Sequence, residues 1–127
     1  MNYAFTKAEL LCSKKSIENL FAGSSRAISV YPLRAVYRPQ TTQSEEKVQL
    51  LISVSKRHFR HAVDRNRIKR LIREAYRHNR ELLTSQLGDK HIDMAIIWMS
   101  DRLCDYSTIE SKLRTILQRI AENEHNI

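Results

Sequence analysis

The pattern of apolar and polar positions predicts three helices in this chain. In residues 61–85 the apolar positions recur at helical spacing and form a stripe along one side of a long helix. Residues 13–22 form a shorter helix, for which Ser13 is a suitable N-cap and Gly23 a natural stop. The last helix begins near Ser107, which has a glutamate at the spacing of a capping box, and the nearby acids Asp101 and Asp105 are also expected to act as caps. Each helix therefore has an apolar side that must pack against another element.

Four strands are predicted between these helices. Residues 48–55 alternate between apolar and polar side chains, as in a strand with one buried face. Residues 27–31 and 33–38 are rich in strand-forming residues and are separated by Pro32, which indicates a bend or an edge. Residues 93–99 contain a continuous apolar run, which is typical of a strand covered on both faces in a parallel pairing. The order α-β-β-β-α-β-α predicts an α/β sandwich with helices packed on a four-stranded sheet.

The composition is that of a folded protein with a single domain, residues 1–127. Apolar residues make up 42% of the chain and charged residues 28%. No apolar run approaches the length of about 18 residues that spans a membrane, and the N-terminus lacks the pattern of a signal peptide. We therefore expect a cytoplasmic protein with no membrane partner, in which Cys12 and Cys104 are reduced thiols.

The excess positive charge is confined to one segment. The net charge is +8, and residues 56–80 account for all of it with ten basic residues and two acids. Such focusing is typical of a surface that binds nucleic acid, because each phosphate that a cation neutralises releases condensed counterions. A merely solvated helix surface usually alternates positive and negative charges, and this segment scarcely does.

On the long helix the basic residues lie beside the apolar stripe. Arg65, Lys69 and Arg73 are four residues apart and form a rail that can follow a phosphate backbone. Asn66 adds an uncharged donor and acceptor for a sugar hydroxyl, a base edge or a metal-bound water, or is simply an exposed amide. Arg67 falls outside this basic stripe.

Residues 53–57 and 62–74 resemble the signature of the bacterial ribonuclease P protein family. The first segment ends a strand with Ser-Val-Ser-Lys-Arg, and the second reads Ala-Val-Asp-Arg-Asn-Arg-Ile-Lys-Arg-Leu-Ile-Arg-Glu. The family's order of elements covers most of the chain. The resemblance implies a left-handed βαβ crossover, whereas general packing rules favour a right-handed one. Residues 58–61 depart from the family, because many relatives carry a glycine there.

The resemblance also implies a function. In that family the protein is a subunit of ribonuclease P, an endoribonuclease that removes the 5′ leader of precursor tRNA. The catalytic RNA subunit performs the hydrolysis with Mg²⁺, so neither a catalytic residue nor a protein metal site is expected in this chain. The implied partners are the catalytic RNA and precursor tRNA, with no small-molecule substrate. The residues expected to contact RNA are Lys56, Arg57, Arg65, Asn66, Arg67, Lys69, Arg70, Arg73 and Arg77.

A cleft for the single-stranded leader is implied by the same resemblance. Its expected residues are Ile17 and Phe21 on the first helix, with Val36 and Tyr37 on a strand. The residues alone favour ordinary core packing for Phe21, and its role in the cleft comes from the resemblance. Aromatic stacking on unpaired bases tolerates any sequence, which suits an unselective grip on the leader.

Other functions are less well supported by the residues, but two of them remain open. The two cysteines have no C-x-x-C spacing, His58 and His61 have no carboxylate cluster beside them, and no glycine-rich phosphate loop is present. A ribosome-associated RNA-binding protein or a transcription factor with its Arg-rich helix in the DNA major groove remain as alternatives. Copurified ribosomal RNA would identify the ribosome-associated protein, and tight binding of duplex DNA at physiological salt would identify the transcription factor.

Overall fold

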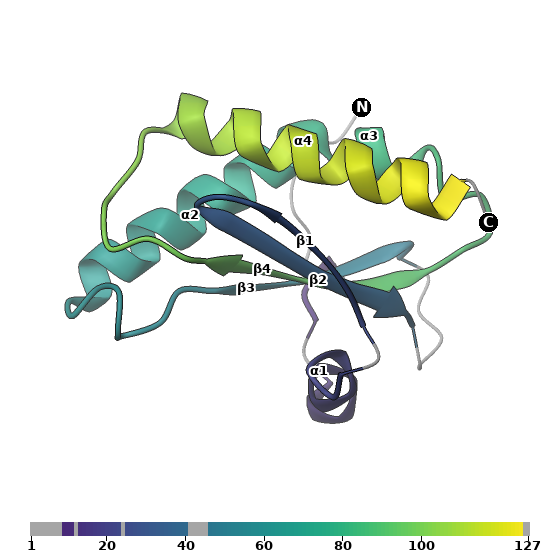
Figure 1. Cartoon of the computed structure of the whole chain (residues 1–127), viewed down its shortest axis with the longest axis horizontal. Coiled ribbons are helices and arrows are strands. Elements are labelled where there is room, and N and C mark those ends of the chain that lie inside the picture. The colour runs from purple at the N-terminus through teal and green to yellow at the C-terminus, as the bar shows by residue number, and fades with distance from the viewer. Residues whose placement is uncertain (1–8, 12, 24, 41–45, 126–127) are drawn as a thin grey trace.

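The architecture is a mixed four-stranded sheet with helices on both faces, seen in Figure 1. The computed structural model describes residues 9–11, 13–23, 25–40 and 46–125. The elements in chain order are α1 (Lys14–Leu20), β1 (Arg26–Val30), β2 (Leu33–Pro39), β3 (Val48–Ser53), α2 (Ala62–Asn79), α3 (Glu81–Thr84), β4 (Ile92–Trp98) and α4 (Tyr106–His125). This order confirms the predicted α/β class and the predicted succession of elements.

The strands lie in the order β1-β2-β4-β3. The β1–β2 hairpin turns at Tyr31 and Pro32, where the sequence predicted a bend. Strand β4 is antiparallel to β2 and parallel to β3, and every one of its side chains except Ile97 is buried or nearly so. The continuous apolar run thus forms a central strand, as predicted. The hand of the β3–α2–β4 crossover stays a prediction.

The two faces of the sheet are covered unequally. Helices α2, α3 and α4 cover one face and enclose the main core, which includes Ile72 and Trp98. Of the described residues, the short helix α1 and Leu11 before it lie against the other face (Figure 1), in a small cluster of Leu11, Leu20, Val36 and Ala95. As far as the described residues go, the sheet is therefore closed on one side and partly open on the other.

Two predicted helix features are wrong in detail. The long helix ends at Asn79 and a short separate helix, α3, follows it. The Asn79 side chain donates to the Ala75 carbonyl at 2.8 Å, and such local bonds compete with a continuous helix. The second error is the capping box at Ser107: the N-cap of α4 is Asp105, whose carboxylate accepts from the Thr108 amide at 3.0 Å, which confirms the cap predicted at Asp105.

The sequence also predicted reduced cysteines and no membrane span. Cys104 is a free thiol, whereas Cys12 lies outside the described residues. Within the described ranges, no helix is both long and apolar enough to cross a membrane.

Candidate nucleic-acid interface

The basic helix α2 is presented by a short loop that follows β3. Phe59 in this loop is buried in the main core and anchors it. The Arg65 Nη1 atom donates to the carbonyls of Phe59 and Arg60, at 2.9 and 3.1 Å. Arg65 therefore fixes the entry to α2 from a half-buried position, and the predicted rail of Arg65, Lys69 and Arg73 is not a set of three equivalent outward cations.

The outward face of α2 is centred on a different set of residues. Asn66, Arg67, Arg70 and Arg73 are exposed and Lys69 is half-buried, and together with Val63 they line one surface depression. Arg67 belongs to this set, so the prediction that it falls outside the basic stripe is wrong. The residues that line this depression include four basic side chains and no acidic one, which favours a positive potential there. We call this set the α2 basic face.

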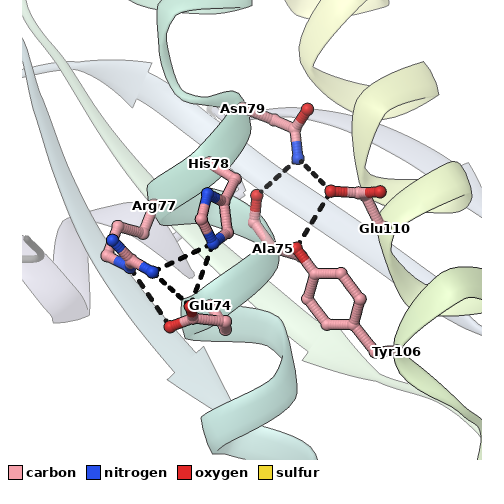
Figure 2. A network of polar contacts seen from close by, with 7 residues as sticks. All are labelled: Glu74, Ala75, Arg77, His78, Asn79, Tyr106 and Glu110. Carbon is pink, nitrogen blue, oxygen red and sulfur yellow. Dashed lines mark hydrogen bonds and ion pairs between the residues drawn. The ribbon is translucent and has the colours of Figure 1, made fainter. Parts of the chain in front are cut away.

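Arg77 lies apart from the α2 basic face. Figure 2 shows its guanidinium paired with Glu74, one turn earlier on the same helix, with His78 beside both. The Arg77 Nε donates to Glu74 Oε2 at 3.2 Å, and this hydrogen bond is the main reason why the pKa of Glu74 is lowered. The charge of Arg77 is thereby largely balanced within the protein.

Arg80 is balanced in a similar way by a residue far away in the sequence. Its Nη1 lies 2.5 Å from the Glu9 carboxylate, and both side chains are mostly buried. Arg77 and Arg80 are therefore expected to contribute little to an outward-facing positive surface.

Helix α2 is held against α4 by polar contacts beneath this surface. The Asn79 side chain and the Tyr106 hydroxyl both donate to Glu110 Oε2, at 3.0 and 2.9 Å, as drawn in Figure 2. These hydrogen bonds lower the pKa of Glu110, while burial and the bond to Glu110 raise the pKa of Tyr106 to about 12. The network locks the C-terminal turn of α2, so the α2 basic face rests on a rigid support. The sequence suggested only a cap for Glu110.

Lys56 and Arg57 lie in the turn after β3, and both are exposed. The Nδ1 atom of the neighbouring His58 lies 2.6 Å from the Asp101 carboxylate. Within the described ranges, no group of three or more His, Cys, Asp or Glu side chains is arranged to hold a metal ion.

The four predicted cleft residues do not lie on one surface. Ile17 and Val36 pack in the cluster under α1, and Phe21, at the C-terminal end of α1, is 50% exposed and so is not a core residue. Tyr37 is 1% exposed and lies in the main core on the opposite face, where its hydroxyl accepts from Asn123 on α4. The prediction that Tyr37 lines the cleft is wrong, because neighbouring residues of a strand point to opposite faces.

Known proteins similar to this chain agree on one family. The family model described as Ribonuclease P matches residues 5–121. The "Ribonuclease P protein component" of Porphyromonas gingivalis is 42% identical over 123 residues, which cover 95% of this chain and 89% of that protein. The protein of the same name from Chlorobaculum tepidum is 30% identical over 131 residues, covering 94% and 84%.

Solved structures agree on the fold. The ribonuclease P protein of Thermotoga maritima matches with a TM-score of 0.69 at 22% identity, over 87% of this chain and 96% of that one. The Staphylococcus aureus ribonuclease P protein matches with a TM-score of 0.70 at 20% identity, over 89% and 95%. Taken with the sequence match along nearly the whole length, these likenesses show that the chain belongs to the ribonuclease P protein family, the protein components of that endoribonuclease.

Proposed function

We propose that this protein works in the cytoplasm and uses two surfaces in the removal of the 5′ leader from precursor tRNA. The α2 basic face binds the catalytic RNA subunit of ribonuclease P, and the partly open sheet face beside α1 binds the single-stranded leader. The RNA subunit carries out the hydrolysis with Mg²⁺, and the protein contributes binding and a positive field. The proposal rests on membership of the family and on the geometry of these two surfaces.

The observation that carries the proposal is the clustering of basic side chains on the α2 basic face. Arg67, Lys69, Arg70 and Arg73 share one depression with Asn66, and no acid lines it. Guanidinium groups bind phosphate oxygens with paired donors, which suits a backbone whose sequence need not be read. An RNA that folds into a compact shape brings its phosphates close together, and a positive surface reduces the electrostatic repulsion between them.

The leader surface is supported by a separate observation. Phe21 is half exposed at the end of α1, and Val36 lies on the sheet face below that helix. An exposed aromatic ring can stack on any unpaired base, and each such contact typically contributes about 1–3 kcal/mol. This fits a leader whose sequence varies from one precursor to another.

Reconstitution at low Mg²⁺ tests the proposal. The protein is added to a bacterial ribonuclease P RNA at a Mg²⁺ concentration where that RNA alone is inactive, and 5′ processing of precursor tRNA is measured. We expect the wild-type protein to restore processing, and the protein by itself to cleave nothing. The protein compared with the wild type is a variant in which Lys69, Arg70 and Arg73 are all replaced by Gln. Equal rescue by this variant, or cleavage by the protein alone, would refute the proposed division of roles.

A further inference from the structure

Helix α1 has little to stabilise its position, although Phe21 at its end is a proposed binding residue. It has 7 residues, and a helix of two turns is not stable by itself in water. Its apolar contacts are with the small cluster around Leu20 and Val36, which is separate from the main core. The position of α1, and of Phe21 at its end, therefore depends on additional contacts with the sheet.

Arg38 on β2 provides one such contact. Its Nη1 donates to the Asn19 carbonyl in the last turn of α1, at 2.9 Å. A cation at this end of a helix is favourable for two reasons. It donates a hydrogen bond to a terminal carbonyl, and it is attracted to the negative end of the helix dipole. Phe21 follows two residues after Asn19, so a fixed Asn19 carbonyl restricts where the Phe21 ring can lie.

Asp93 is an acidic residue on the strand next to Arg38. Arg38 and Asp93 are directly opposed in the β2–β4 ladder, so both side chains lie on the α1 face of the sheet. Asp93 is 0% exposed, and among the described residues neither of its carboxylate oxygens has a hydrogen-bond partner. Such a group is costly to bury unless a positive charge lies near it. Burial raises the pKa of Asp93, and the Arg38 charge acts in the opposite direction.

We propose that Arg38 is a positioning residue for leader binding: it fixes the last turn of α1 to β2 and so sets where Phe21 meets the leader, with Asp93 as its counter-charge. Arg38 itself makes no contact with the leader in this arrangement. The inference rests on the proposed function, because it assigns Arg38 a role only through the leader surface.

Hydrogen exchange of the free, full-length protein tests the anchoring step. In Arg38→Gln we expect the amides of Leu20 and Phe21 to exchange about fivefold faster or more, while the amides of α2 are unchanged. Arg34→Gln is the matched control, because Arg34 is exposed on the same strand and the same face, four residues away. Unchanged exchange in α1, or equal acceleration in both variants, would overturn the anchoring. If Arg38→Gln does not fold, Arg38→Lys, which keeps the charge but loses the planar fork, takes its place with the same expectation.

Leader-length dependence tests the functional step. Holoenzymes reconstituted with each variant are titrated with precursor tRNA carrying either a leader long enough to cross the surface or a leader of a single nucleotide. We expect Arg38→Gln to weaken binding of the long-leader substrate about fivefold, near the lower end of what one stacked base contributes, and to leave the short-leader substrate unaffected.

A double variant separates positioning from direct contact. If Arg38 acts through Phe21, Arg38→Gln combined with Phe21→Ala binds the long-leader substrate no worse than Phe21→Ala alone. Additive losses would show that Arg38 touches the leader itself and would overturn the positioning role. A different failure, in which Phe21→Ala shows no dependence on leader length, would refute the proposed leader surface, whatever the exchange experiment shows about α1.

Discussion

Replacing Arg70 with Gln removes one outward cation from the centre of the α2 basic face. Arg70 is exposed, lines the depression, and makes no hydrogen bond or ion pair to another described residue. Its loss therefore removes a phosphate contact without leaving a partner unsatisfied. Each lost contact is expected to lower the slope of log affinity against log salt by roughly 0.7–0.9.

The same slope gives the expected loss of affinity. If one contact contributes nothing near 1 M salt, it contributes about five- to eightfold at 0.1 M and roughly three- to fourfold at 0.2 M. The assay is fluorescence anisotropy of a labelled bacterial ribonuclease P RNA titrated with protein at several salt concentrations. The loss of affinity in Arg70→Gln should shrink steadily as the salt concentration rises.

A matched control separates a local contact from net charge. Arg119→Gln removes the same charge from an exposed position on α4, away from the α2 basic face. We expect Arg119→Gln to retain the wild-type slope. An unchanged slope in Arg70→Gln, or the same reduction in both variants, would refute the reasoning that the positive charge acts through this face.

Further predictions concern the neighbouring contacts and the core. Arg77→Gln should leave the salt slope of RNA binding close to that of the wild type, because Glu74 already balances Arg77; a reduction as large as that of Arg70→Gln, in the same titration, would contradict the assignment. Glu110→Ala should lower the free energy of unfolding by about 1–2 kcal/mol, measured by urea denaturation, because Asn79 loses an acceptor. The pKa of Glu110 is lowered in the folded protein, so the contribution of its carboxylate to the free energy of unfolding is fully present above the ordinary value of 4.5 and is lost as the pH falls below it. The difference in unfolding free energy between the wild type and Glu110→Ala should therefore shrink in acid, and a difference that does not depend on pH would contradict this. Ile72→Ala should cost about 2–5 kcal/mol in the same denaturation assay, because Ile72 is 0% exposed in the main core, and a loss below about 1 kcal/mol would show that the site repacks freely.

The order and type of the elements could be predicted because each has a recognisable signal: an apolar period, a continuous apolar run or a richness in strand-forming residues. Residues 48–55 and 93–99 differ in pattern, and that difference alone distinguished a strand with one buried face from a strand covered on both faces. The break after Asn79 could not be predicted, because it involves a side chain whose partners include Glu110 on a helix distant in the sequence. Local propensity contains no information about such a contact.

The candidate site was predictable in composition but not in orientation. The charge count singled out the segment that contains α2, but in the structure Arg65 bonds to loop carbonyls and Arg77 to Glu74, and such pairings depend on loop and rotamer geometry. Strand alternation implied that Val36 and Tyr37 face opposite ways, but which of them faces α1 depends on where the helices pack.

The most direct test of the central claim is site-specific photocrosslinking from the edge of the α2 basic face. Val63 is 78% exposed and lines the depression, so Val63→benzoylphenylalanine places a photoreactive group there without removing a cation. In the reconstituted holoenzyme we expect this group to crosslink to the ribonuclease P RNA, and the same group at Glu122, exposed on α4, to give no RNA adduct. RNA adducts from position 122 together with none from position 63 would contradict the account.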